Sequence, residues 1–141
     1  MSTDIEEVAA DLRRAVTRLH SRFRSERVEG EVPDAALLVL LVLLKQGPKS
    51  LSELAEAGRV TLGSMSQTVR RLEQQGLVSK ARDTEDRRRV IFTLTVAGTT
   101  AATTSQRHRR DWLNARLAEL TADERQDILR AAALLLRLAD S

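Results

Sequence analysis

Hydrophobic residues recur at helical spacing between Thr61 and Gln75, and they predict an amphipathic helix over this range. The residues of its apolar face are Leu62, Met65, Val69 and Leu72. We expect this face to be buried, since residues three and four apart lie on the same side of a helix. The opposite face carries side chains that donate or accept hydrogen bonds: Ser64, Ser66, Gln67, Arg70, Arg71 and Gln74. Gly76 follows, where helices often end with a left-handed residue.

A β-hairpin is predicted directly after this helix, over residues 77–95. Leu77 and Val78 begin the first strand, and the β-rich segment Val90–Thr95 forms the second. Between them lies the sequence DTEDRRR at positions 83–89, which is too polar to be buried and is rich in arginine. A helix with a polar face, followed by a hairpin with an arginine tip, suits a DNA major groove and the adjacent phosphates or minor groove.

Three Ser/Thr-x-x-Glu sequences predict helix starts elsewhere, at Thr3, Ser50 and Thr121. The first opens a helix that should run to about Arg27. Its apolar stripe is Ile5, Val8, Leu12, Val16, Leu19 and Phe23. This stripe is too long for a small core, which suggests that part of it packs on another subunit. The helix after Thr121 has leucines on more than one face, which also suggests burial against a partner.

The segment Ala35–Leu44 is apolar on all sides, so periodicity alone does not assign it to helix or strand. Its length and the Gln-Gly-Pro sequence at 46–48 favour a buried helix. A short helix follows at 51–57, and residues 58–60 form the turn before the amphipathic helix. Two helices joined by such a short turn form a helix-turn-helix, in which the second helix reads DNA. A long helix is expected after the hairpin, at about 99–120.

Three short motifs resemble the signature of the MarR family of bacterial transcriptional regulators. They are RRLEQQGLV at 70–78, D-x-x-DRR at 83–88 and LT-x-x-G at 94–98. The resemblance extends in order and length over nearly the whole chain. It implies a mostly α fold with a small β-wing, with a winged helix-turn-helix lobe at 33–98 and dimerisation helices at 1–32 and 99–141. It also implies a homodimer that regulates genes, most often as a repressor, on an inverted-repeat operator in double-stranded DNA.

The residues predicted to bind DNA lie on the polar face of the helix and at the hairpin tip. They are Ser64, Ser66, Gln67, Arg70, Arg71, Arg87, Arg88 and Arg89. Ser66 and Arg71 match positions where the resembling family has a hydroxyl residue and an arginine. Gln67 departs from the arginine often found there, and glutamine can pair bidentately with adenine. We therefore regard Gln67 as a candidate for setting base preference.

A simpler interpretation of the arginines at the hairpin tip is a run of charged residues that are exposed to solvent. Asp83 and Asp86 stand in the same tip, which suggests that Asp86 braces one arginine while another enters a narrow minor groove. The resemblance favours Arg88 for insertion. Charge supports the DNA interpretation, because eight basic and four acidic residues between positions 59 and 95 give +4, whereas the rest of the chain contributes −1 to the total of +3.

Composition and motifs argue against other classes of protein. The chain of 141 residues is 42% hydrophobic and 30% charged, as is ordinary for a globular domain. It lacks cysteine, so a disulfide, a thiolate metal site and a cysteine redox switch are excluded. His20 and His108 show no metal-binding spacing, and no phosphate-binding loop or GxSxG sequence occurs. We predict a non-enzyme without metal or cofactor. No signal peptide or transmembrane segment is evident, which indicates the cytoplasm and no membrane partner.

The resemblance also implies a small-molecule effector, often aromatic and anionic, bound where the dimerisation helices meet the DNA-binding lobe. Trp112, with Arg and His residues near it, would suit such a ligand, although Trp112 and Phe23 as plain core residues are the alternative. Two other functions stay open at this point. One is a winged-helix module that binds proteins, which should have a neutral or acidic helix face. The other is an architectural DNA binder without sequence preference.

Overall fold

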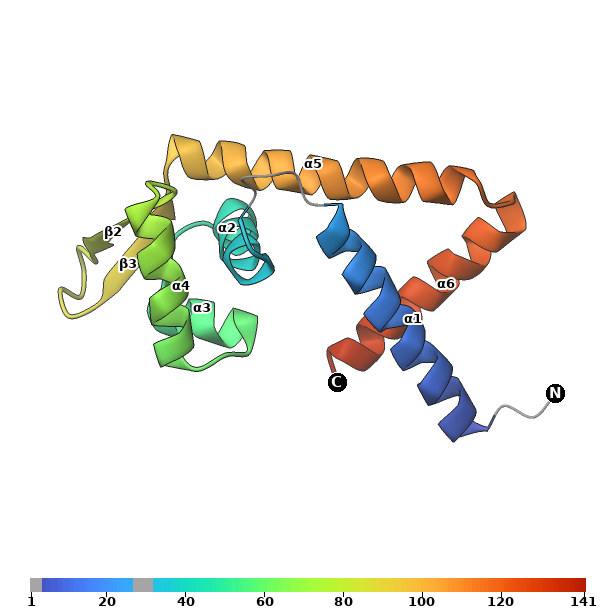
Figure 1. Cartoon of the computed structure of the whole chain (residues 1–141). Helices are drawn as coiled ribbons and strands as arrows, with labels where there is room; N and C mark the ends of the chain where they lie inside the picture. Colours follow the sequence, from blue (N-terminus) through green and yellow to red (C-terminus); the bar gives the residue numbers. More distant parts are fainter. Residues whose placement is uncertain (1–3, 27–31) are drawn as a thin grey trace.

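The computed structural model describes residues 4–26 and 32–141, and most of them are helical. The helices are α1 Ile5–Ser25, α2 Asp34–Gln46, α3 Leu51–Gly58, α4 Leu62–Gln74, α5 Val96–Ala118 and α6 Ala122–Ala139. The strands are β1 Lys49–Ser50, β2 Val78–Arg82 and β3 Val90–Leu94. The long helix α5 joins two lobes, one of α2, α3, α4 and the sheet, the other of α1 and α6 (Figure 1). The mostly α fold with a small β-wing is thus confirmed.

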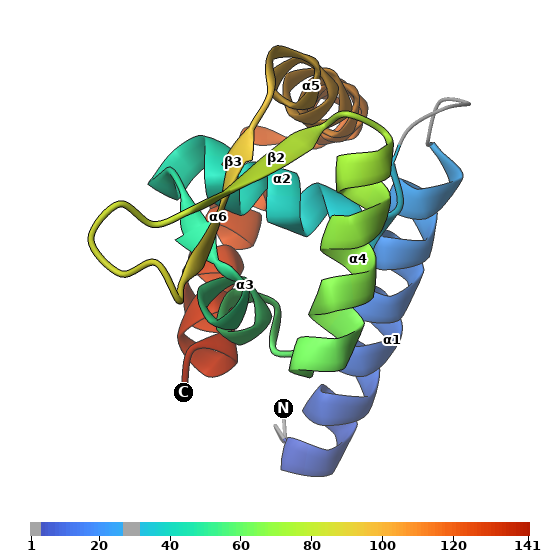
Figure 2. The same cartoon turned by 90° about the vertical axis from the view of Figure 1, so that its left-hand side faces the viewer.

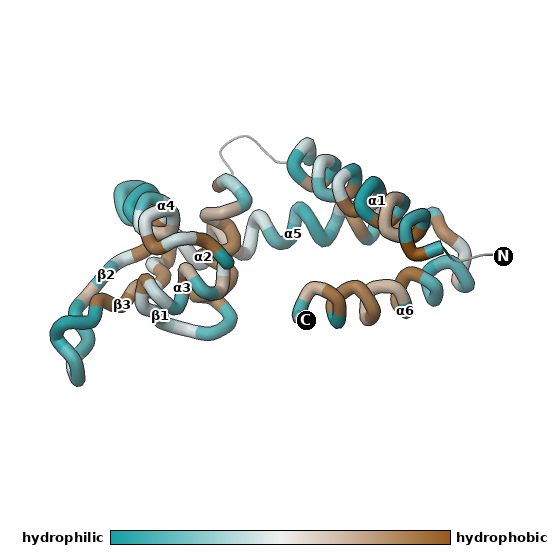
Figure 3. Tube along the Cα trace, turned by 90° about the horizontal axis from the view of Figure 1, so that it is seen from below, coloured by the Kyte–Doolittle hydropathy of each residue, from teal (hydrophilic) through white to brown (hydrophobic). Residues whose placement is uncertain are grey.

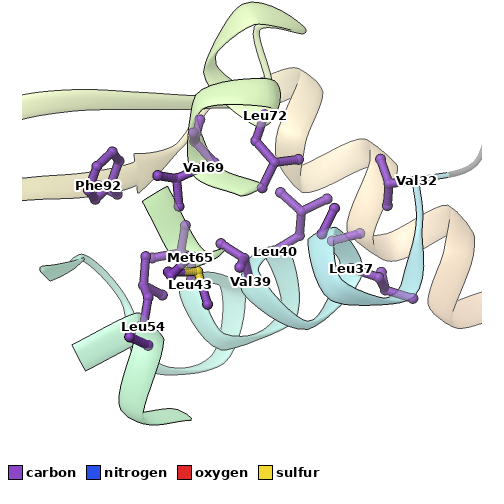
Figure 4. Close-up of a cluster of buried hydrophobic side chains, with 14 residues drawn as sticks. Val32, Leu37, Val39, Leu40, Leu43, Leu54, Met65, Val69, Leu72 and Phe92 are labelled. Atoms are coloured by element: carbon purple, nitrogen blue, oxygen red, sulfur yellow. The ribbon is translucent and has the colours of Figure 1, made fainter. Parts of the chain in front are cut away.

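The hydrophobic core lies around α2, as the run of apolar residues predicted. Its fully buried side chains include Leu37, Val39 and Leu40 of α2, which meet Leu54 of α3 and Leu72 of α4 (Figure 4). Burying such a side chain contributes about 1.5–3 kcal/mol to stability. Because α3, α4, α5 and β3 all contact α2, apolar residues are buried on most sides of this helix, while Leu38 and Leu44 stay partly exposed. The core therefore fixes the position of α4.

The helix starts follow the capping patterns in two of the three expected places. Ser50 and Thr121 each form a capping box, with Glu53 and Glu124 as the reciprocal partners. Hydrogen bonds from Thr121 hold the pKa of the Glu124 carboxyl below its ordinary value. The third start differs. Asp4 caps α1 by accepting from the backbone N–H of Glu6 at 3.2 Å.

The sequence predicted a first helix that starts at Thr3 and runs to about Arg27. Both of these residues lie outside the described residues. Within the described part, α1 ends at Ser25, and Glu26 is its C-cap.

The end of α4 is closed by a left-handed glycine, as predicted. Gly76 has φ +74°, and its N–H donates to the carbonyl of Glu73 at 3.0 Å. The N–H of Leu77 donates to the carbonyl of Leu72 at 2.9 Å, which completes a Schellman motif. At the other end of α4 one prediction was wrong. Leu62 was assigned to the buried face but is 53% exposed, because it stands in the first turn of the helix, beyond the core.

The sheet has a strand that the sequence did not predict. β1 has only two residues and pairs with β3, so the antiparallel order is β1-β3-β2. A segment this short shows no periodicity, and its partner lies some 40 positions further along the chain, with Lys49 opposite Phe92. β2 and β3 form the expected hairpin, in which Val78 pairs with Leu94 and Arg82 with Val90.

The helix α5 begins at Val96, three residues earlier than the predicted start at Thr99. Thr95 is its N-cap, and the Thr95 hydroxyl accepts from the N–H of Gly98 at 3.0 Å. The same hydroxyl donates to the carbonyl of Gly76 at 2.6 Å. A Cβ at Gly98 would lie 1.9 Å from the carbonyl oxygen of Leu77. The LT-x-x-G motif therefore docks the start of α5 tightly on the turn between α4 and β2.

The helices α1 and α6 contrast with this core. No residue of either helix is buried in the single chain. Both expose large apolar side chains, and hydrophobic residues follow one another along α6 (Figure 3). No helix in the described part of the chain is long and apolar enough to cross a membrane.

The Gly98 contact gives a test of this docking. Replacing Gly98 with alanine should lower the free energy of unfolding by about 1–3 kcal/mol, because the new methyl group would overlap backbone that cannot move alone. Urea unfolding of the purified protein would measure it. Gly63→Ala is the matched control, since a Cβ at Gly63 has no heavy atom within 4 Å. Equal unfolding midpoints for the two variants would contradict the docking role of Gly98.

Candidate nucleic-acid interface

The outer face of α4 is polar and open to solvent. Ser64, Gln67 and Arg70 are exposed, and Ser66 is half-buried. Met65, Val69 and Leu72 point the other way and are buried in the core. Because the core fixes one side of the helix, the polar side has a defined direction. We call α4, the helix predicted to read DNA, the reader helix from here on.

The first turn of the reader helix is held by its own cap. The Thr61 hydroxyl accepts from the backbone N–H of Ser64 at 3.1 Å. The Thr68 hydroxyl donates to the carbonyl of Ser64 at 3.2 Å. These bonds use only the backbone of Ser64, and its side chain is exposed. It lies in the N-terminal half of the helix, where base edges are usually read.

The two adjacent arginines of the reader helix have different surroundings. Arg70 is exposed on the outer face. Arg71 lines a shallow cavity together with Pro33, Thr68 and Gln75, so it lies on the side of the helix toward the start of α2. Arg71 is therefore better placed for a phosphate at the edge of a groove than for a base at its floor.

The wing consists of β2, the loop 83–89 and β3, and its two aspartates fold the loop. The Asp83 carboxylate accepts from the N–H of Glu85 at 3.1 Å, and the Asp86 carboxylate accepts from the N–H of Arg88 at 3.1 Å. The Arg82 guanidinium donates to the carbonyl of Arg87 at 2.9 Å. These bonds explain why the D-x-x-DRR motif needs acidic residues in a loop of arginines. Hydrogen bonds within the loop thus determine the shape of the tip.

The arginine that Asp86 contacts is Arg88 itself. The Arg88 Nε lies 3.3 Å from the Asp86 carboxylate, and the Arg88 side chain is 93% exposed. The sequence had suggested that Asp86 braces one arginine while another enters the groove. In the structure Asp86 orients the very residue expected to be inserted. Such an exposed pair adds little stability, so the Arg88 side chain can leave Asp86 at small cost.

Arg89 differs from its two neighbours, because it is paired with a residue outside the wing. Its guanidinium is ion-paired with the carboxylate of Glu53 in α3. The same carboxylate accepts from the backbone N–H of Ser50 at 3.0 Å in the capping box. These hydrogen bonds from Ser50, with the charges of Arg89 and Lys49 nearby, hold the pKa of Glu53 below its ordinary value. Arg89 thus links the wing to α3, and Arg87 and Arg88 are left at the tip.

The reader helix and the wing lie on the same side of the molecule (Figure 2). The residues predicted to bind DNA belong to these two elements, and the exposed Ser64, Gln67 and Arg70 lie on the polar face of α4. Arg89 has a protein partner, and its contact with DNA stays a prediction. Sequence reasoning missed the contribution of Glu53, whose role in the capping box was visible but whose pairing with Arg89, 36 positions away, was not.

A second polar cluster lies where α1, α2 and α5 meet, around Asp34. The Asp34 carboxylate is 2.5 Å from the Arg109 guanidinium, 3.5 Å from His20 Nε2 and 3.8 Å from Arg24 Nε. Nearby, the Trp112 ring meets Phe23 edge to face, with 5.3 Å between centroids. In the described residues, the buried Nε of Arg109 and Nε1 of Trp112 have no hydrogen-bond partner.

An apolar cavity of about 320 Å³ adjoins this cluster and shares Asp34 with it. Its other lining residues are Ala35, Leu38, Gly58, Val60, Ser64, Met65 and Thr68. Three of them, Ser64, Met65 and Thr68, belong to the reader helix. A molecule in this cavity would touch Met65, on the buried side of the helix, and also Ser64, one of the residues predicted to bind DNA. Among the described residues, no three His, Asp or Glu side chains could hold a metal ion together.

Comparison with known proteins supports the interpretation of this surface as one that binds DNA. A model of the MarR family matches residues 33–90. An HTH-type transcriptional regulator of Mycobacterium bovis is 35% identical over 134 residues, which cover 94% of this chain and 93% of the relative. The chain belongs to the MarR family. The protein is therefore a MarR-family transcriptional regulator and, like this family, a non-enzymatic DNA-binding protein.

Two further members are similar to this MarR-family regulator over most of its length. The HTH-type transcriptional repressor NicR of Pseudomonas putida is 30% identical over 136 residues, which cover 96% of this chain and 84% of NicR. The structure of Bordetella bronchiseptica BpsR, whose DNA binding is regulated by 6-hydroxynicotinic acid, superimposes with a TM-score of 0.74. BpsR is 26% identical, and the match covers 96% of this chain and 99% of BpsR.

The exposed Arg88 gives the test of the wing. Arg88→Ala should weaken DNA binding and lower the slope of log affinity against log salt by about one charge, because one phosphate or groove contact is lost. Titrations at several salt concentrations would measure both. Arg116→Ala, which removes an exposed arginine near the end of α5, is the control. An unchanged affinity and slope for Arg88→Ala would remove the wing tip from the interface.

Proposed function

We propose that this MarR-family regulator is a repressor that binds an inverted-repeat operator as a homodimer and is released by a small aromatic anion. The observation that carries the proposal is the shared surface of the reader helix and the wing. Buried residues fix the direction of its exposed polar side chains, and its basic tip is preshaped by two aspartates. The name of the relative NicR, a repressor, supports the sign of regulation.

The exposed apolar faces of α1 and α6 support the homodimer. Ile5 of α1 is 83% exposed, and Leu129 and Leu136 of α6 are 65% and 64% exposed. Large apolar side chains exposed in such number mark interaction sites. A second copy of the chain would bury these faces by two-fold symmetry, as is usual for soluble oligomers.

Operator geometry follows from that symmetry. A two-fold dimer presents two reader helices to successive major grooves on one side of the duplex, about 34 Å apart. The operator would then be an inverted repeat with half-site centres roughly 10 bp apart. As a DNA-binding regulator, the protein would act in the cytoplasm.

The apolar cavity behind the reader helix supports an effector site. Leu38, Val60 and Met65 would pack on an aromatic ring, and Arg109 and Arg24 beside Asp34 would attract a carboxylate. Regulation of BpsR by an aromatic acid supports this chemistry. A ligand releases DNA only if it binds better to a form in which the reader helices are wrongly spaced.

The dimer can be tested on α6. Leu136→Glu should convert the dimer into a folded monomer, because a charge at this position is harmless when exposed but would be buried unpaired in an interface. Sedimentation velocity would measure the change, with circular dichroism to show that the chain is folded. Gln126→Glu, on the same helix, is the control. A dimer that persists with Leu136→Glu would place the interface elsewhere.

Footprinting tests the function itself, on DNA that flanks the protein's own gene and at near-physiological salt. We expect two protected patches one helical turn apart, related by two-fold symmetry. Protection should disappear when a small aromatic carboxylic acid is added. Uniform weak protection that vanishes with modest salt would contradict the proposal, since it would mean phosphate contact without base reading.

A further inference from the structure

Two of the five described glycines are required by backbone conformation. Gly47 has φ +81° and Gly76 has φ +74°, values that other residues rarely adopt. Each closes a helix, Gly47 at the end of α2 and Gly76 at the end of α4. Neither position needs a further explanation.

Two other glycines are closely packed, and at Gly98 the packing excludes any side chain. A Cβ at Gly98 would lie 1.9 Å from the carbonyl oxygen of Leu77. A Cβ at Gly58 would lie 3.2 Å from Leu38 and 3.3 Å from Met65, tighter than ordinary van der Waals contact. In these places the protein itself occupies the space of the missing side chain.

Gly63 has neither reason. It stands in the first turn of the reader helix with an ordinary helical backbone, and a Cβ built on it would have no heavy atom within 4 Å. Glycine is among the poorest helix formers, because it loses the most backbone freedom. Alanine would fit the folded chain here and would favour the helix. The fold alone thus gives no account of glycine at this position.

The position of Gly63 around the helix axis shows which face of α4 it belongs to. At about 100° per residue, Gly63 falls on the same stripe as Gln67 and Arg70, one and two turns further along. This stripe points away from Met65, Val69 and Leu72, the residues that anchor the helix in the core. Gly63 therefore stands at the N-terminal end of the outermost line of the reader helix.

We propose that residue 63 is glycine because DNA occupies the space of its missing side chain. The inference rests on the proposed function. It adds the point at which the helix approaches DNA most closely. The first turn of α4 lies against the floor of the major groove, at a distance that excludes even a methyl group. Glycine is the residue that permits such an approach of backbone to a ligand.

A close approach at Gly63 explains the character of its neighbours. Ser64 has a short side chain, which reaches a base edge only if the helix backbone is near the floor of the groove. Gln67 has a longer side chain and lies one turn away, so it can reach a base from the same position. Gly63 is then a positioning residue for base reading, while the arginines contact phosphates.

The test is Gly63→Ala, measured on the operator duplex recovered by footprinting and on a random duplex of equal length and salt. The melting temperature should rise by about 1–4 °C, because a helix former replaces glycine in open space. Affinity for the operator should fall at least about tenfold, since the methyl group holds the reader helix away from the bases. Affinity for random DNA should stay within about twofold.

Asn114→Ala is the matched control, because it also improves an exposed helix, α5, but lies away from the reader helix. It should leave both affinities unchanged. Unchanged operator affinity for Gly63→Ala would overturn the inference, and so would equal losses on operator and random DNA. If the wild-type protein itself does not prefer the operator, the proposed function fails, and the inference fails with it.

Discussion

Burial of α2 is the constraint on which the rest of the structure depends. Leu37 and Leu40 are almost fully inaccessible, and α3, α4, α5 and β3 all contact this helix. The reader helix therefore has no freedom to roll, because a small rotation would bring Val69 or Leu72 out of the core and a polar residue in. Loss of such burial costs several kcal/mol, far more than a polar contact on the surface returns. The core thus sets the direction of the polar side chains that are proposed to meet DNA.

The wing is positioned by a different kind of interaction. Arg89 joins it to Glu53, and Glu53 also completes the capping box of α3. One carboxylate serves both the start of a helix and the placement of the hairpin. Arg87 and Arg88 remain at the tip, where the contact of Arg88 with Asp86 is exposed and weak. Both ion pairs are solvent-exposed, but the first joins the wing to α3 and the second lies within the tip.

The sequence predicted much of this fold, because its signals are local. Helical spacing, two capping boxes and Gly76 located the helices to within a few residues. The errors have physical reasons. α5 begins three residues early because Thr95 caps it, and Leu62 lies beyond the reach of the core. The strand β1 and the pairing of Arg89 with Glu53 depend on residues that meet only after folding. The DNA contacts of individual residues need the complex, so they remain predictions.

The two lobes are joined at the point where DNA reading begins. Arg59, the left-handed residue between α3 and α4, donates to the carbonyl of Ala139 at the end of α6, with a distance of 3.1 Å. The turn before the reader helix therefore contacts the lobe whose exposed leucines are proposed to form the dimer. The apolar cavity lies beside the same turn, with Gly58 and Val60 in its lining. Subunit packing, cavity occupancy and the first turn of α4 all meet there. Because the core resists rotation of α4, we expect a shift of one of them to move the lobe of α2, α3, α4 and the sheet as a unit.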